Sequence, residues 1–197
     1  MKLSSILVGA LILCGALYFL YPAVFGNIFP DSVAGQMILT YADGSTKTVN
    51  GGTSLAVAQA GSSAAITSVR WVVKATTNWQ DTSISTISGA SWTCFATVSV
   101  DGVVKQTVST PQNPPTSISR GGQYTILTWD VSGATLNGWV PFDYKSHAVT
   151  FSTDVTYTFT PPSSTATTIS GNAAGNLSLQ NIGFPATLTV TGTATVS

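Results

Sequence analysis

The residues best equipped for chemistry in this chain surround its single histidine. Asp143 precedes His147 by four residues and Ser146 is its neighbour, so a carboxylate, an imidazole and a hydroxyl lie close together in the sequence. These are the groups of a nucleophilic triad, in which histidine takes a proton from serine and a carboxylate orients the histidine. They lie in a β-loop context and not in the strand–turn–helix context of a nucleophile elbow. We therefore interpret His147 as a polar residue that caps a strand, and we expect no enzyme.

Metal and cofactor chemistry has little support elsewhere in the sequence. One histidine and one cysteine beyond the N-terminal segment, His147 and Cys94, are too few for a zinc site within one chain. The sequence contains no acidic calcium loop, no CxxC or HExxH motif and no glycine-rich phosphate loop between a strand and a helix. We expect no metal and no cofactor, with calcium held by dispersed aspartates as the alternative. Cys94 alternates with apolar residues and is expected to be buried.

Most aspartates are explained by turns, which this residue type favours. Asp43 and Asp101 each precede a glycine between two strand-like runs. Asp130 follows a tryptophan, and one hypothesis is that it is half-buried and paired with Arg120 or Lys145.

Aromatic residues outside the strand pattern are the best candidates for binding. Trp79 lies in TTNWQDTS, and Trp139, Phe142 and Tyr144 lie in LNGWVPFDYKSH. Exposed rings can stack on glycans or anchor a protein partner. The alternative is that these rings close the ends of a β-sandwich. Asn176, in the sequon NLS, is the candidate N-glycosylation site.

After residue 30, apolar and polar side chains alternate with the period of two that indicates half-buried β-strands. In SWTCFATVSV we expect every second residue to be buried, namely Trp92, Cys94, Ala96, Val98 and Val100. In AITSVRWVVKAT the residues expected to point inward are Val69, Trp71, Val73 and Ala75. Asp101-Gly102 favours a type I′ hairpin turn, in which both central residues need a positive φ. GQMILTYADGSTKTV predicts a second hairpin.

No helical periodicity follows residue 30, and strand patterns recur about every eight to twelve residues. The predicted fold is therefore all-β: an antiparallel β-sandwich or jelly-roll-like ectodomain, residues 31–197, preceded by one N-terminal transmembrane helix. TPQNPPT, residues 110–116, is the strongest internal break. It separates two small sandwiches or joins two sheets of one, and we favour one domain. SSTATT and the glycines near Asn172 and Asn176 suggest a long mobile loop.

The last strand pattern, ATLTVTGTATV, is long and uncharged. We expect it to pair within its own domain. Because no lysine or inward-pointing charge guards it, the alternative is that it adds to the sheet of a neighbouring subunit.

The N-terminal segment, residues 1–30, is predicted to be a membrane anchor and stalk. Residues 3–21 carry no charge and as a helix would span roughly 28 Å, close to the ~30 Å of a bilayer core. Pro22 ends the apolar run, and Lys2 places residues 31–197 on the outer side of the membrane. The alternative is a cleaved export signal, cut before Asn27. The anchor residues expected to contact lipid include Leu3, Leu7, Leu11, Leu17 and Tyr21.

The composition of the chain limits the kinds of partner that we expect. Charged residues make up 7% of the chain and the net charge is zero, so we expect no nucleic-acid partner. The 30 threonines and 24 serines must supply much of the solubility.

The LSSILVGALILCGALYFL segment, the GQMILTYADGSTKTV hairpin and the Thr/Ser/Val-rich strands give the chain its overall layout. This layout resembles the membrane-anchored, β-rich surface and virion structural proteins of thermoacidophilic archaea and their viruses. The resemblance implies an architectural role as a coat, turret, tail or surface-filament subunit, in an extracellular position or on the virion exterior. The expected partners are the bilayer, copies of the same chain and other coat proteins. The alternative function is an anchored or secreted binding module that recognises a glycan or receptor.

Overall fold

The computed structural model describes residues 33–56, 65–79, 82–111, 114–160, 167–183 and 187–197. The predicted anchor, residues 3–21 with Leu3, Leu7, Leu11, Leu17 and Tyr21, lies outside these ranges, as does the stalk up to residue 30. Among the described residues, no helix has the length and hydropathy needed to cross a bilayer.

The described chain is an all-β structure whose strands pair antiparallel throughout. One sheet has the order β2-β1-β4-β9. Its strands are β1 (Val33–Tyr41), β2 (Thr46–Asn50), β4 (Ile66–Thr76) and β9 (Gln123–Ser132). The predicted hairpin at Asp43 is confirmed as the β1–β2 connection, where the backbone N–H and the hydroxyl of Ser45 both donate to Asp43 Oδ1, over 2.8 and 2.6 Å.

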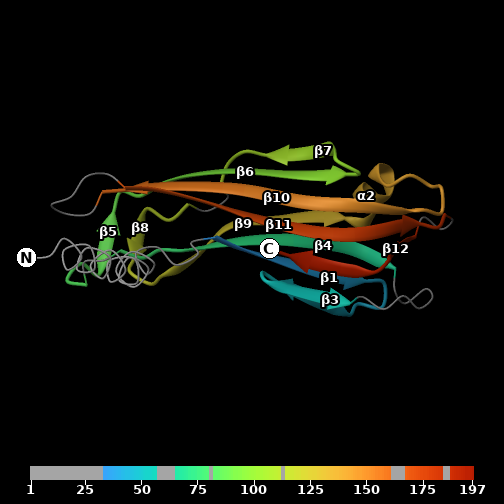
Figure 1. Cartoon of the computed structure of the whole chain (residues 1–197), viewed down its shortest axis with the longest axis horizontal. Coiled ribbons are helices and arrows are strands. Elements are labelled where there is room, and N and C mark those ends of the chain that lie inside the picture. Colours follow the sequence, from blue (N-terminus) through green and yellow to red (C-terminus); the bar gives the residue numbers. More distant parts are fainter. Residues whose placement is uncertain (1–32, 57–64, 80–81, 112–113, 161–166, 184–186) are drawn as a thin grey trace, which may run out of the picture.

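The larger sheet has the order β3-β13-β11-β10-β6-β7, with β12 also paired to β11. Its centre is the long hairpin of β10 and β11, which keeps one register from Ser146–Gln180 to Phe159–Thr167. Figure 1 shows this hairpin running along the length of the molecule. The strands are β3 (Thr53–Ala56), β6 (Ser91–Val100), β7 (Val103–Val108), β10 (Ser146–Phe159), β11 (Thr167–Asn181), β12 (Leu188–Val190) and β13 (Thr193–Val196).

The two sheets face each other across a shared core. Alternation in β4 and β6 is confirmed, because all the residues expected to point inward there are buried, Cys94 included. The ring centroids of Trp71 on β4 and Phe151 on β10 lie 5.9 Å apart, which brings the two sheets into direct contact. A core of this kind is what period-two alternation on facing sheets produces.

The β6–β7 turn is also confirmed. Asp101 has φ 50° and Gly102 has φ 79°, the two positive values that a type I′ turn requires. The backbone N–H of Asp101 donates to the carbonyl of Ala148, so the turn is tied to the start of β10.

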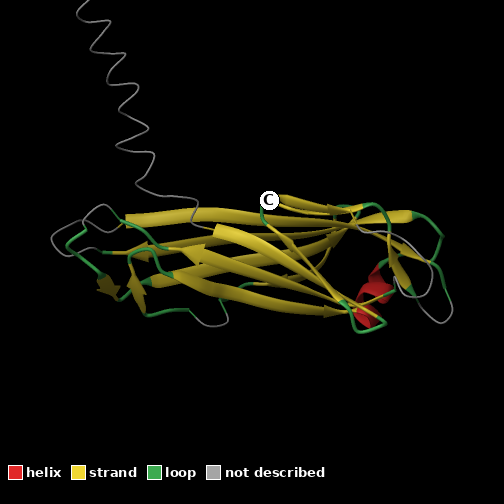
Figure 2. Cartoon of the chain, turned by 90° about the horizontal axis from the view of Figure 1, so that it is seen from below, coloured by secondary structure: helices red, strands yellow, loops and turns green. Residues whose placement is uncertain are grey.

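Two expectations about local structure were wrong. A short helix, α2 (Gly133–Trp139), follows β9, because Ser132 caps it by accepting a hydrogen bond from the backbone N–H of Thr135. The predicted mobile loop begins at 163–166, outside the described residues, but from Thr167 to Asn181 it is a regular strand. Glycine is required there, because a Cβ at Gly175 would come within 2.7 Å of the Trp71 ring. Figure 2 shows α2 at one end of the sheets.

The terminal segment pairs within its own chain and is not a free strand. β13 lies between β11 and β3, so both of its edges are occupied. Gly192, with φ 85°, separates it from β12. Strands on the two sides of residues 110–116 share sheets: β6 pairs with β10, and β5 (Thr86–Ser88) pairs with β8 (Ser117–Ser119).

Candidate docking site at the helix end

The loop between α2 and β10 presents two aromatic side chains to solvent. Phe142 is 57% exposed and Tyr144 is 62% exposed, and their ring centroids lie 4.9 Å apart. Ile182, directly after β11, is 43% exposed. The residue after it, Gly183, lies so close to the Phe142 ring that a Cβ would approach to 2.5 Å. We call Phe142, Tyr144 and Ile182 the aromatic tip.

Backbone contacts hold this loop in an unusual conformation. Tyr144 has φ 60°, a left-handed value that costs a non-glycine residue roughly 1–2 kcal/mol. The side-chain amide of Gln180 on β11 donates to the Tyr144 carbonyl. The residue before Tyr144, Asp143, accepts a hydrogen bond from the backbone N–H of Lys145 at 2.9 Å. The loop is therefore positioned by one contact within itself and by one from β11.

His147 lies between two carboxylates, one of which belongs to Asp143, the residue between Phe142 and Tyr144. Its Nδ1 is 2.6 Å from Asp101 Oδ2, and its Nε2 is 2.9 Å from Asp143 Oδ1. The residue is only 8% exposed. The second oxygen of Asp101 accepts a hydrogen bond from the backbone N–H of Ala148 at 2.9 Å. We call Asp101, His147 and Asp143 the His147 cluster.

The electrostatics of the cluster follow from these contacts. Hydrogen bonds to Asp101 and then Asp143 raise the pKa of His147 above its ordinary value, against the opposing effect of desolvation. The bond to His147 lowers the pKa of Asp101, assisted by the N–H of Ala148. The pKa of Asp143 is lowered by His147 first and by the N–H of Lys145 second. The three residues thus favour their charged forms together.

This arrangement does not suit a nucleophilic triad. Both ring nitrogens of His147 face carboxylates, so neither faces a serine hydroxyl. Ser146 Oγ instead lies 2.8 Å from Ser178 Oγ and also bonds the hydroxyl of Thr191. The two carboxylates lie on opposite sides of the imidazole and cannot converge on one ion. In the described part of the chain, no group of three or more His, Cys, Asp or Glu side chains is arranged so that it could hold a metal ion.

Two of the four aromatic candidates lie in the aromatic tip, and two do not. Trp79 is 5% exposed, its indole N–H donates to the Ile84 carbonyl, and its ring lies 5.9 Å from that of Phe159. Trp79 is therefore a core residue, which corrects its proposed role as an exposed contact. Trp139 ends α2 and is partly buried against the core.

The structure also shows where the polar candidate residues lie. Asn176 is exposed on β11, where its Oδ1 accepts a hydrogen bond from Thr150. Asp130 pairs with neither Arg120 nor Lys145. It pairs with Arg70, 2.7 Å away on the neighbouring strand β4 and directly opposite it in register. Arg120 donates instead to the carbonyl of Trp79.

Sequence reasoning missed the residues that complete this site from other elements. Asp101 was assigned only to its turn, although its side chain reaches a histidine 46 positions later. Gln180 and Gly183 carried no signal, because their role depends on β11 ending beside the loop. A type I′ turn with Asp in place of Asn was the one available hint, since both residues suit the turn but only Asp can form an ion pair with a protonated histidine.

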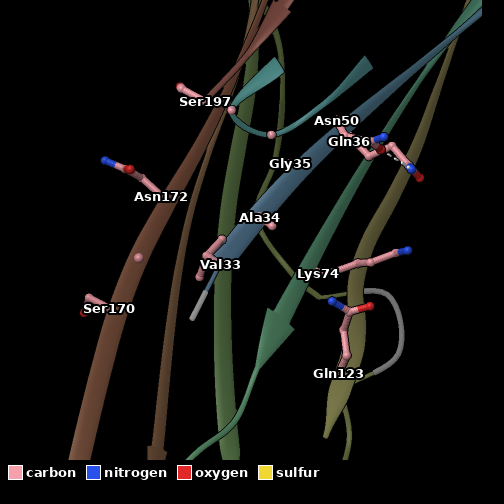
Figure 3. Close-up of a pocket in the computed structure, with 13 residues that line it drawn as sticks. Val33, Ala34, Gly35, Gln36, Asn50, Lys74, Gln123, Ser170, Asn172 and Ser197 are labelled. Atoms are coloured by element: carbon pink, nitrogen blue, oxygen red, sulfur yellow. Dashed lines mark hydrogen bonds between the residues drawn. The ribbon is translucent and has the colours of Figure 1, made fainter. Parts of the chain in front are cut away.

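A second surface feature is a polar groove of about 810 Å³ near the start of β1. Figure 3 shows Ser170 and Asn172 of β11 on one side of β1, and Lys74 and Gln123 on the other. Gln36 donates to Asn50 Oδ1 at 2.7 Å beside it. The described lining combines four carboxamides and two serine hydroxyls with glycine, alanine and valine residues, and Lys74 is its one charged side chain.

Comparison with known proteins identifies no similar protein. No family model, no curated protein and no solved structure matches the chain.

Proposed function

We propose that this chain is a non-enzymatic structural protein. In this proposal residues 3–21 anchor it in a membrane, and the β-body assembles with copies of itself into a virion coat, turret, tail or cell-surface structure. The fold proposed is a sandwich-like ectodomain behind one transmembrane helix. The proposal rests on the described architecture and on the layout of the sequence.

The observation that carries the proposal is the aromatic tip. Burying apolar surface contributes roughly 25 cal/mol per Å², and aromatic side chains are frequent anchors of protein interfaces. Phe142 and Tyr144 are more than half exposed, although most of the other large apolar side chains in the described part of the chain are buried. Their loop is held in place before any partner arrives, which reduces the entropy lost on docking.

The outer face of the larger sheet supports the same role. Hydroxyls there pair across strands: Thr156 with Ser170 at 3.1 Å and Thr158 with Thr168 at 3.0 Å. Such a surface is solvated without charge, so its hydration does not depend on carboxylates that lose their charge in acid. This property suits a body exposed to a variable exterior.

The experiment compares self-association of the full chain and its variants in detergent by sedimentation velocity. The double variant Phe142→Ser/Tyr144→Ser is expected to weaken association at least tenfold. Phe95→Ser is the matched control, because Phe95 is 51% exposed but lies on β6, outside the aromatic tip. Unchanged association of the double variant, or equal loss in the control, would contradict the proposal.

A second candidate function is glycan binding in the polar groove. Carboxamides both donate and accept hydrogen bonds, as sugar hydroxyls do, and the groove brings Gln36, Asn50, Gln123 and Asn172 together from four strands. Neutral gluco-, manno- and N-acetylglucosamine oligosaccharides would be titrated against the labelled full chain. Binding is expected to shift the side-chain amide resonances of Gln123 and Asn172 and to weaken in Asn172→Ala. No shift at millimolar sugar would exclude this function.

A further inference from the structure

We propose that His147 is a proton-dependent clamp on the aromatic tip: the protonated ring ties the loop to the β6–β7 turn, and loss of its proton releases the loop. This inference rests on the proposed docking role of the tip and adds its regulation by pH.

The first step of the argument is a count of protons. Both ring nitrogens lie within hydrogen-bond distance of a carboxylate oxygen, 2.6 Å at Nδ1 and 2.9 Å at Nε2. A neutral imidazole has one N–H, so it can donate to only one of them, and its other nitrogen would direct a lone pair at a carboxylate. Only the imidazolium donates to both. The lowered pKa values of Asp101 and Asp143 keep both carboxylates charged while His147 is protonated.

The second step identifies which arm of the clamp moves. Asp101 is fixed, because the backbone N–H of Ala148 holds its other oxygen and its own N–H donates to the Ala148 carbonyl. Among the described residues, the N–H of Lys145, two residues away, is the one group of its own loop that holds Asp143. Since Phe142 and Tyr144 flank Asp143, the bond from His147 to Asp143 is the one that controls the aromatic pair.

The third step concerns what favours release of the loop and what opposes it. The left-handed backbone at Tyr144 favours relaxation of the loop when a tether is lost. The remaining tethers are the Gln180 amide on the Tyr144 carbonyl and the packing of Phe142 against Gly183. We therefore expect a loop that loosens and stays attached, and not one that unfolds.

Few charged residues on the neighbouring elements could compete with the His147 cluster in controlling the loop. The strands β6, β11 and β12 and the helix α2 contain no charged residue. β7 contributes Lys105, the loop contributes Lys145, and β10 contributes Asp154, which lies seven residues beyond His147 and opposite Phe95. Of these, Lys145 also lowers the pKa of Asp143.

The test follows the ring of His147 and the amide of Lys145 in the full chain by NMR between pH 5 and pH 9. The ring is expected to titrate above the ordinary histidine pKa of 6.5. Protection of the Lys145 amide, corrected for intrinsic exchange, is expected to fall at least tenfold through the same transition. In His147→Gln the protection of the Lys145 amide should be low at every pH, and the same is expected in Asp143→Asn. Asp130→Asn, which breaks the separate pair with Arg70, is the control and should titrate as the wild type does.

Protection at Lys145 that is unchanged through the titration of His147 would overturn the clamp. A ring that titrates at or below 6.5 would do the same. These readouts do not require association, so they test the clamp even if the tip does not dock. Conversely, if association depends on Phe142 and Tyr144 but is equal at pH 5 and pH 9, the docking proposal stands and the clamp fails.

Discussion

Trp71 on β4 donates its indole N–H to the hydroxyl of Thr153 on β10 over 2.8 Å, and both residues are fully buried. This bond joins the two sheets across their shared core. It satisfies the indole N–H, which would lose free energy if it were buried without a partner.

Replacing Thr153 by Val should lower the free energy of unfolding by about 1–3 kcal/mol, because the indole N–H loses its acceptor while the volume stays similar. Chemical denaturation monitored by tryptophan fluorescence measures this. In a Trp71→Phe background the same replacement should have little effect or even stabilise the protein. An equal loss in both backgrounds would show that the bond does not matter.

Gly175→Ala should destabilise the protein by about 1–3 kcal/mol, since the new methyl group would overlap Met37 and Trp71 in the packed core. Gly138→Ala is its counterpart on α2, where a Cβ meets nothing within 4 Å. That change should stabilise the protein by about 0.5–1 kcal/mol through helix propensity. Thermal and denaturant unfolding of the two variants should therefore move in opposite directions. A neutral Gly175→Ala would contradict the packing assigned to β11.

Tyr157→Phe should stabilise the protein by about 1 kcal/mol. The Tyr157 ring stacks on Trp92 at 4.5 Å, but its hydroxyl is buried with no hydrogen-bond partner among the described residues. Burial also raises its pKa to about 12. Removing the hydroxyl keeps the stacking and relieves an unpaired polar atom. A clear loss of stability in equilibrium unfolding would indicate that the hydroxyl has a partner.

Stability should depend on pH through the His147 cluster. Because the folded pKa of His147 is raised, its contribution is complete below about pH 6.5 and is lost as the pH rises through the folded value. Because the pKa values of Asp101 and Asp143 are lowered from 3.8, their contribution is present above about pH 3.8 and is lost as the pH falls through the folded values. The difference in unfolding free energy between wild type and His147→Gln should peak between these limits. A difference that does not vary with pH would contradict the assigned contacts.

The faces of the strands were predictable because side-chain alternation is a local property. A residue in β6 or β4 points inward or outward according to its position in a period of two, whichever strand lies beside it. The turn at Asp101-Gly102 was predictable for the same reason, since two adjacent residues that tolerate positive φ are sufficient to specify it.

Local reasoning failed where a distant part of the chain decides the outcome. The Gly-rich pattern around Gly171 and Gly175 is typical of a loop, but the Trp71 ring needs small residues opposite it, and β11 supplies one. Ser132 suits a helix N-cap, yet a helix of only seven residues is too short to show a helical period.

The sequence alone therefore determined the all-β character of the described chain, the buried faces of its main strands and the position of its hairpin turns. Each depends on residues within a few positions of one another. Only the tertiary structure decided that Trp79 is buried, that Asp130 meets Arg70, and that Asp101 reaches His147. These outcomes depend on which strands become neighbours, and that choice is made by the packing of the whole core, which no local pattern encodes.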